Sequence, residues 1–281
     1  MHPLLTKIAA NSSTALRFAA EILESHRSPQ KRLRVLVAAN SHFKYQTVIG
    51  LWLSGHRIRR AKLNSEDLSN YDLVLPFTLE DIETLRRHED SLGASLLPLP
   101  SMDAVALCND KRLLDQELSR QGFAQHIPKS GTDLSPPLII KKRISAYSKG
   151  IHPVFKAGDF GAVESLLKDP DYYCQHYVEG PSEYALHVIM REGRLVAWLN
   201  IGYHYDTEYP VKGRSKVRCN QIEDCEHLEL FEAMLRKIGF QGLCCINYKL
   251  ENRTPMLLEI NPRFGGSLRK FFFMMVRQLG D

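Results

Sequence analysis

Near the end of the chain, the sequence reads MLLEINPRFGGS from Met256 to Ser267. Its first five residues predict a strand, which must end because a proline and a glycine pair follow. Glu259, Asn261 and Arg263 occupy alternate positions at this strand end. While the chain stays extended, alternation places all three side chains on one face.

These residue types suit one kind of chemistry. The carboxylate of Glu259 and the amide of Asn261 are hard oxygen donors, which bind Mg²⁺ together with substrate phosphates. The guanidinium of Arg263 suits a phosphate or a carboxylate. The open turn Gly265-Gly266-Ser267 leaves room for a substrate. The string therefore predicts a phosphoryl-transfer site. The alternative, a buried strand with a salt bridge and a turn, gives these residues no separate tasks.

Composition bounds the class of protein. A chain of 281 residues suits two or three small lobes, and 44% hydrophobic with 25% charged residues is ordinary for a globular protein. The net charge of +5 fits a small polyanionic ligand. Without a Lys/Arg block we expect no nucleic-acid partner. The longest apolar run near the end, Phe271 to Val276, is too short to span a bilayer, so we expect no membrane partner.

The cysteines and the N-terminus indicate a cytoplasmic protein. The six cysteines form no CxxC pair and read as reduced thiols, mostly in the core. Lys7 and Arg17 interrupt the first residues, so these lack a signal-peptide core. Helical periodicity from Ser12 to Ser25 predicts an N-terminal helical extension over residues 1–30.

Residues 31–101 alternate between strand and helix patterns, which predicts a small parallel α/β lobe. No GxGxxG follows the first strand, so dinucleotide binding is not expected there. The expected strands are Leu33–Ala39, Tyr71–Pro76 and Leu96–Leu99, and the expected helices are Tyr45–Ser54 and Leu79–Glu89.

The rest of the chain divides into a helix-led segment and strand hairpins. A polar start at Cys108–Leu114 opens an amphipathic helix that ends near Gly122. Further along, the expected elements are strands Leu138–Arg143 and Tyr172–Val178, the hairpin Glu183–Met190 with Leu195–Ile201, the helix His227–Ile238, and the hairpin Leu243–Leu250 with Met256–Ile260.

Two other segments carry candidate ligand contacts. Lys141 ends a buried-type strand and precedes a loop in which Ser148 and the backbone N–H groups up to Gly150 could cradle an anion. Gln175 to Gly180 could connect two lobes and present backbone groups to a flat heteroaromatic ring, with Tyr177 or Val178 as apolar cover. Solvated lysines and an ordinary strand with a turn are the alternatives.

A third segment carries alternating cations: Lys212, Arg214, Lys216 and Arg218. If this segment is extended, all four point one way and need an anion or an acidic layer to meet them. A solvated loop is the equally weighted alternative. Arg218 is counted among the catalytic candidates.

In this order, these strings resemble the ATP-grasp superfamily of carboxylate–amine ligases, from about Met102 to the C-terminus. The motifs that carry the resemblance are Asn109-Asp110-Lys111, Leu138 to Lys141 with Ser148-Lys149-Gly150, Gln175 to Gly180 with Glu183, and Glu259-Ile260-Asn261-Pro262-Arg263.

The resemblance implies an α/β fold: a pre-ATP-grasp lobe at 31–101, a small lobe at 102–175 and a C-terminal lobe at 176–281. It implies ATP with Mg²⁺ or Mn²⁺ as cofactors. It also implies residue roles: Lys111 and Lys141 on phosphates, Gln175, Tyr177 and Val178 around adenine, Glu183 on ribose, Glu259 and Asn261 on the metal, and Arg263 on the transferred phosphoryl group.

Three departures from the family pattern stand out. The position 12 residues before Glu259, where the family usually has a further carboxylate ligand, is Asn247, which keeps an oxygen donor but loses a charge. The loop Ile144 to Tyr147 lacks the usual glycines. The chain stops soon after the Phe271–Val276 run, so a second subunit of a homodimer could complete the acceptor site.

The first reading is therefore an ATP-dependent ligase that activates a small carboxylic acid as an acyl phosphate and joins it to an amine, an amino-acid or peptide-like metabolite. The alternative is a degenerate ATP-grasp that binds nucleotide as a regulatory or scaffold module. A thiol enzyme using Cys244 or Cys245 is a third reading, disfavoured because the pair lies inside an apolar strand.

Overall fold

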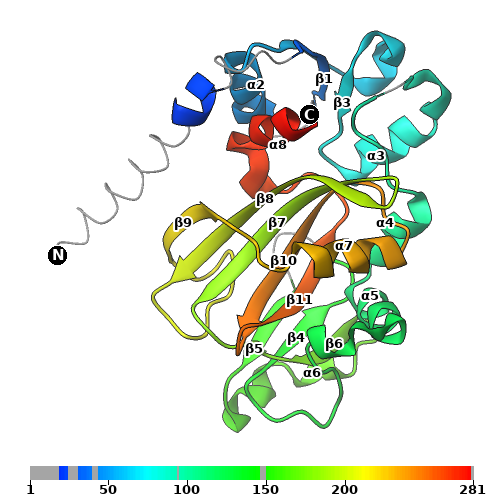
Figure 1. The fold of residues 1–281 in the computed structure, drawn as a ribbon. Coiled ribbons are helices and arrows are strands. Elements are labelled where there is room, and N and C mark those ends of the chain that lie inside the picture. The colour runs from blue at the N-terminus through cyan, green and yellow to red at the C-terminus, as the bar shows by residue number, and fades with distance from the viewer. Residues whose placement is uncertain (1–18, 25–30, 40–43, 94, 146–149, 280–281) are drawn as a thin grey trace.

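The computed structural model describes residues 19–24, 31–39, 44–93, 95–145 and 150–279. The described residues form three sheets, arranged along the molecule as Figure 1 shows. A parallel three-stranded sheet lies at one end, a five-stranded antiparallel sheet in the middle and a three-stranded antiparallel sheet at the other end. The α/β class predicted from the sequence is confirmed.

The parallel sheet has the order β2-β1-β3, with β1 Arg34–Ala38 between β2 Arg57–Ala61 and β3 Leu73–Leu75. The apolar strand β1 is central and buried, as its sequence predicts. β2 was not predicted, because RIRRA is an edge strand with exposed arginines and no apolar alternation. The prediction of a strand at Leu96–Leu99 was wrong, since the chain there forms bends.

The helices of this lobe are α2 Lys44–Leu53 and α3 Leu79–Arg86. Three short 3₁₀ turns accompany them: η1 Leu63–Ser65, η2 Leu68–Asn70 and η3 Glu89–Ser91.

A helical segment leads from this sheet to the far end of the molecule (Figure 1). Helix α4 Met102–Asn109 ends at Asp110, which is also the N-cap of α5 Lys111–Leu118. The Asp110 carboxylate accepts hydrogen bonds from the backbone of Arg112 and Leu113, and Arg143 pairs with the same carboxylate. This cap fixes Lys111 at the first turn of α5. A π-helical turn, η4 Ser119–Phe123, and a 3₁₀ turn, η5 Ala124–His126, complete the segment.

The small sheet has the order β5-β4-β6. β4 Leu138–Lys142 is central and pairs antiparallel with β5 Ile151–Val154 and β6 Tyr172–His176. β5 was not predicted, since its four residues include a proline and a histidine. The 3₁₀ helix η6 Ala157–Ala162 and α6 Glu164–Leu167 follow β5. A small core of Leu138, Ile140, Val154 and Val163 holds the sheet together.

The large sheet has the order β11-β10-β7-β8-β9. Both predicted hairpins are confirmed: β7 Ser182–Arg191 pairs with β8 Arg194–Tyr205, and β10 Gly242–Glu251 pairs with β11 Thr254–Asn261. The edge strand β9 Val217–Glu223 was missed because it is largely polar and exposed. The helix α7 Leu228–Lys237 buries Phe231, Met234 and Leu235 against this sheet.

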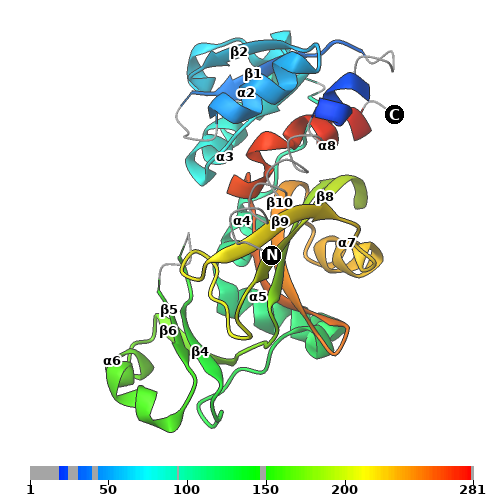
Figure 2. The same ribbon diagram turned by 90° about the vertical axis from the view of Figure 1, so that its left-hand side faces the viewer.

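The end of the described chain returns to the beginning (Figure 2). The 3₁₀ turn η7 Gly266–Lys270 and α8 Phe272–Gln278 share one apolar core with the parallel sheet. The ring of Phe264 meets Phe77 at 4.9 Å and Phe272 at 5.5 Å between centroids. This packing explains the apolar run at residues 271–276. In the described part of the chain, no helix has the length and apolarity to cross a membrane.

Candidate functional site

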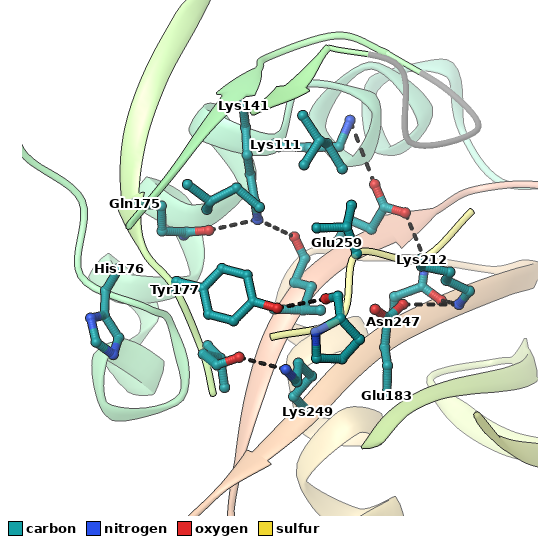
Figure 3. A pocket seen from close by; sticks show the side chains of 16 residues that line it. Lys111, Lys141, Gln175, His176, Tyr177, Glu183, Lys212, Asn247, Lys249 and Glu259 are labelled. Carbon is teal, nitrogen blue, oxygen red and sulfur yellow. Dashed lines mark hydrogen bonds and ion pairs between the residues drawn. The ribbon is translucent and has the colours of Figure 1, made fainter. Parts of the chain in front are cut away.

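A pocket whose empty space, open solvent included, is about 650 Å³ lies between the small sheet and the large sheet (Figure 3). Eight of the residues predicted from the sequence line it: Lys111, Lys141, Gln175, Tyr177, Val178, Glu183, Asn247 and Glu259. They come from α5, β4, β6, the connector after β6, β7, β10 and β11. Segments far apart in the sequence therefore converge on one cavity. We call the side carried by β4 and β6 the small-sheet wall, and the side carried by β7, β10 and β11 the large-sheet wall.

The small-sheet wall is centred on Lys141, which is 5% exposed. Its ammonium donates to Gln175 Oε1 at 2.6 Å and to the Leu258 carbonyl at 3.3 Å. Burial lowers the pKa of Lys141, and the carboxylates of Asp115 and Glu259 oppose that effect. Strand alternation turns the next residue, Lys142, away to pair with Asp171.

Asp115 stands behind Gln175 and completes this wall. Its carboxylate accepts a hydrogen bond from Gln175 Nε2 at 2.9 Å and one from the Tyr173 hydroxyl at 3.2 Å. Burial raises the pKa of Asp115 to about 6, although Lys141 acts in the opposite direction. The sequence analysis missed Asp115. Its position in α5, four residues after Lys111 and hence on the same helix face, was the available signal.

Glu259 is the centre of the large-sheet wall. Asn247 lies directly opposite it across the β10–β11 pair. Glu259 Oε1 accepts hydrogen bonds from Asn247 Nδ2 at 2.7 Å and from Asn261 Nδ2 at 2.9 Å, and Oε2 lies 3.5 Å from the Lys111 ammonium. Burial alone would raise the pKa of Glu259, but Lys111 and these amide donors hold it below its ordinary value.

Lys212 enters the large-sheet wall from the segment between β8 and β9. Its ammonium lies 3.0 Å from Glu183 Oε1 and 2.9 Å from Asn247 Oδ1. Burial acts to lower the pKa of Lys212, but the Glu183 carboxylate outweighs it and the net pKa is raised. Of the two alternatives for the four alternating cations, the shared strand face does not apply, because the chain turns at 212–215 and only the strand β9 beyond it is extended.

The connector after β6 closes one end of the pocket. The Tyr177 hydroxyl donates to the Pro210 carbonyl at 2.5 Å. The Lys249 ammonium donates to the Val178 carbonyl at 2.6 Å and lies 5.1 Å from the centre of the Tyr177 ring. Burial lowers the pKa of Lys249 to about 8, with Glu183 opposing it. Lys249 was missed by the sequence analysis, although it shares a strand face with Asn247 two residues earlier.

β11 ends before Arg263, so strand alternation does not set the direction of this side chain. β11 ends at Asn261, and the backbone N–H of Arg263 donates to the Asn261 carbonyl at 2.8 Å, which closes a tight bend. Arg263 lines a second, much smaller pocket beside Phe264 and Leu243. The one-face expectation therefore holds only as far as Asn261, because the strand does not continue through Pro262.

The turn at Gly265-Gly266-Ser267 packs against β7. Ser267 Oγ lies 2.7 Å from His187 Nε2. A side chain on Gly265 would collide with the His187 ring, so a glycine is required there. Burial and the nearby Lys212 lower the pKa of His187 to about 3, so the ring is neutral. His187 was not singled out in the sequence.

Two other candidates lie away from the pocket lining. Arg218 stands on β9 with its side chain 57% exposed and 3.9 Å from Asp206, so the structure does not bring it to the pocket. Gly150 directly precedes β5 and has a left-handed backbone conformation, with φ of 71°, which favours glycine. Ser148 lies outside the described residues.

The donor set fits a metal only together with phosphates. Among the described residues, no three His, Cys, Asp or Glu side chains form a metal-binding group. The pocket offers the Glu259 carboxylate, with the amide of Asn261 hydrogen-bonded beside it, and Mg²⁺ is commonly held by one or two carboxylates plus substrate phosphates. These residues therefore fit Mg²⁺ or Mn²⁺ carried in with a nucleotide.

The paired cysteines are unsuited to nucleophilic chemistry. Cys244 and Cys245 are buried on β10. Burial raises the pKa of Cys245 to about 12, although Lys212 opposes it, and burial also raises that of Cys244. A thiol enzyme at this pair is disfavoured because it would need an accessible thiolate.

Comparison with known proteins agrees with this arrangement. No curated protein matches the chain. Among solved structures, a D-Ala:D-Ser ligase of Enterococcus faecalis is similar with a TM-score of 0.59 at 15% identity, covering 89% of this chain and 96% of that one. A D-alanine–D-alanine ligase of Bacillus anthracis, solved with ATP, has a TM-score of 0.54 at 14% identity, covering 89% and 97%. An L-amino acid ligase of Bacillus licheniformis has a TM-score of 0.55 at 15% identity, covering 87% and 70%.

At these identities the structures show a shared fold. The sequence itself carries the stronger result, because residues 108–267 match the family model described as an ATP-grasp domain. That match spans more than half of the 281 residues and includes every pocket-lining residue. The chain belongs to the ATP-grasp family.

Proposed function

We propose that this protein is an ATP-dependent, ADP-forming ligase that activates a small carboxylic acid as an acyl phosphate and joins it to an amine. The observation that carries the proposal is the convergence of Lys111, Lys141 and Glu259 on one pocket between two sheets. The similar solved structures support it, since they are ligases of amino acids and one was solved with ATP. The two substrates are proposed to be amino-acid or peptide-like metabolites.

The nucleotide would lie along the pocket between the two walls. Lys141 and Lys111 supply fixed positive charge for phosphate oxygens. Glu183 would hold the ribose, and the connector at Tyr177 and Val178 would hold the base. The Val178 carbonyl already accepts a hydrogen bond from Lys249, so the base would meet that lysine as well.

The metal would bind on the large-sheet wall. Glu259 and Asn261 would hold Mg²⁺ or Mn²⁺ with the phosphates completing its coordination. A bound divalent cation would supply neutralisation of the charge on the transferred phosphoryl group. The chain's own contribution is to fix the Glu259 carboxylate between two amide donors and Lys111.

The reaction proceeds in two displacements. A carboxylate oxygen of the acid attacks the γ-phosphorus of ATP, an oxygen–phosphorus bond forms, and ADP leaves. The amine then attacks the acyl carbon, inorganic phosphate leaves, and the amine nitrogen loses a proton. Positioning and charge neutralisation account for the rate in such a site. Arg263 would steady the phosphoryl group, and the turn at residues 265–267 would face the acid and amine.

A second candidate is a degenerate ATP-grasp that binds nucleotide without ligation. It is favoured by the pairing of both pocket carboxylates with lysines, Glu183 with Lys212 and Glu259 with Lys111. In that state each carboxylate already has a cation. Nucleotide binding without substrate-dependent turnover would distinguish this function from a ligase.

The test is a turnover screen with pooled amino acids and small carboxylic acids. The ligase function predicts ADP and phosphate release that requires both an acid and an amine, with a product whose mass equals their sum less one water. Nucleotide binding without any such release would favour the second candidate. We propose a cytoplasmic location and a homodimer, the latter to be checked by light scattering.

A further inference from the structure

Lys212 places its ammonium inside the pocket, on the large-sheet wall. Its side chain is 26% exposed, and its ammonium lies between Glu183 at 3.0 Å and Asn247 at 2.9 Å (Figure 3). It reaches this point from the segment that also places Pro210 and Val211 on the pocket lining. Pro210 is tied to the connector by the Tyr177 hydroxyl. The Lys212 ammonium is therefore held in position by contacts on both of its sides.

The hydrogen bonds of Asn247 fix which way its side-chain amide oxygen and nitrogen point. Its Nδ2 donates to Glu259 Oε1 and its Oδ1 accepts from Lys212. In the reverse orientation, the amide NH₂ would face an ammonium and the amide oxygen would face a carboxylate, and both contacts would be repulsive. Asn247 is thus a neutral link between an anion and a cation. Its oxygen, which a metal at this position would need, is already used by the lysine.

The net charge of the pocket lining also favours a nucleotide with a single metal ion. Among the described residues, the lining includes the lysines 111, 141, 212 and 249 and the glutamates 183 and 259, so the formal sum is +4 − 2 = +2. A nucleoside triphosphate with one bound divalent cation keeps about two negative charges, and with two such cations it keeps about none. A single-metal nucleotide therefore neutralises this pocket, whereas a two-metal nucleotide leaves the excess positive charge in place.

We propose that the Lys212 ammonium is a built-in cation between Glu183 and Asn247, so that the pocket binds a nucleoside triphosphate with one divalent cation, held on the Glu259 side. This inference rests on the proposed nucleotide binding and adds the metal stoichiometry. It also accounts for the residue at 247. An asparagine can link Lys212 to Glu259, whereas a carboxylate there would oppose Glu259 across a 2.7 Å contact.

The experiment counts Mn²⁺ by electron paramagnetic resonance in the complex with the imido analogue of ATP, with protein in excess over nucleotide. The wild-type chain is expected to hold one Mn²⁺ per bound analogue. Asn247→Asp alone is expected to hold one, because Lys212 still neutralises the new carboxylate. Lys212→Met combined with Asn247→Asp is expected to hold two, because the lysine is gone and two carboxylates face each other.

Affinity for the analogue at saturating Mn²⁺ supplies a second readout. Lys212→Met is expected to weaken binding by about tenfold or more, because Glu183 is left without its partner. Lys212→Arg keeps the charge and should restore most of the affinity with one Mn²⁺. Lys216→Met is the matched control, since its exposed side chain lies four residues along the same segment and outside the pocket lining.

The outcomes separate this inference from the proposed function. Failure of the wild-type chain to bind the analogue would remove the nucleotide site, and with it both proposals. Tight binding with two Mn²⁺ per analogue in the wild-type chain would overturn the inference and leave the ligase proposal standing. Unchanged affinity in a folded Lys212→Met variant would also overturn it.

Discussion

The two walls of the pocket are charged in different ways. The small-sheet wall is closed: Lys141, Gln175 and Asp115 are each no more than 6% exposed and bond to one another. The large-sheet wall is more open, with the Glu259 and Lys212 side chains 25% and 26% exposed. One wall thus holds its charges in a fixed internal network, while the other presents partly hydrated charges that a ligand can contact.

This difference indicates that the small-sheet wall mainly stabilises the fold and that the large-sheet wall mainly contacts the reacting groups. Burial dominates the small-sheet wall, raising the pKa of Asp115 to about 6 and lowering that of Lys141. On the large-sheet wall, paired charges and amide donors outweigh burial, so the pKa of Glu259 is lowered. We expect substitutions on the small-sheet wall to cost mainly stability, and those on the large-sheet wall to cost mainly turnover.

The largest effect is expected for Glu259→Gln, which keeps the shape of the side chain but removes the negative charge opposite Lys111. Turnover should fall by about a hundredfold or more, because charge stabilisation at the phosphoryl group is lost. The melting temperature at neutral pH should fall only slightly, by the stability that the charge of Glu259 contributes beside Lys111. ADP release and thermal melting are measured together, with Glu117→Gln as the control, since Glu117 pairs with Arg120 away from the pocket. Near-normal turnover would remove Glu259 from the metal site.

The next effect tests the closed wall. Lys141→Met should lower the free energy of unfolding by about 3 kcal/mol, since it leaves the buried Asp115 and Gln175 without their cation. It should also abolish the stabilisation that an added MgATP analogue gives. Lys142→Met, one residue along and facing Asp171, should change stability by less than about 0.5 kcal/mol. Urea unfolding with and without the analogue measures the stability and the analogue effect for both variants. Equal losses of stability in Lys141→Met and Lys142→Met would contradict the role of the buried network around Lys141.

A smaller effect is a pH dependence of opposite sign on the two walls. The folded pKa of Asp115, about 6, lies above its ordinary value of 3.8. Between these two pH values the folded state therefore binds more protons than the unfolded state. As the pH falls, the buried Asp115 thus destabilises the folded state less. The wild-type advantage over Asp115→Asn should therefore grow by about 1 kcal/mol from pH 7 to pH 5.

Glu259 should behave in the reverse manner. Its folded pKa lies below the ordinary 4.5, so the stability it contributes is present above that value and is lost as pH falls through the folded pKa. The wild-type advantage over Glu259→Gln should shrink below about pH 4.5. Urea unfolding at a series of pH values gives both slopes. Slopes of the same sign for the two variants would contradict the contrast between the walls.

The smallest effect is expected for Arg218→Ala on the exposed edge strand. With its side chain 57% exposed and outside the pocket lining, turnover should stay within about twofold and stability within about 0.5 kcal/mol. The same assays measure it beside Lys212→Met, which lies on the same segment but enters the pocket. A large loss of turnover in Arg218→Ala would return this residue to the catalytic group.

Local sequence patterns were enough to predict the elements that depend on neighbouring residues alone. Alternation along β4 predicts that Lys141 and Lys142 face opposite ways, as they do. The short turn between β10 and β11 sets the register only as far as the pair Tyr248 and Leu257, and a β-bulge then shifts the pairing by one residue and places Asn247 opposite Glu259. The order of several motifs was enough to indicate the ATP-grasp family, since each motif lies at a strand end or a helix start.

The tertiary structure decided what local patterns do not encode. The strands β2, β5 and β9 are short or polar and take their strand form from the neighbour they pair with, so no period in their own residues revealed them. Lys212 lies in a turn, and only the packing of that turn over the connector brings its ammonium to Asn247. Asp115 and Lys249 became pocket residues in the same way. A side chain that enters a site from a loop, or supports it from behind, is placed by contacts between segments distant in sequence, and those contacts exist only in the folded chain.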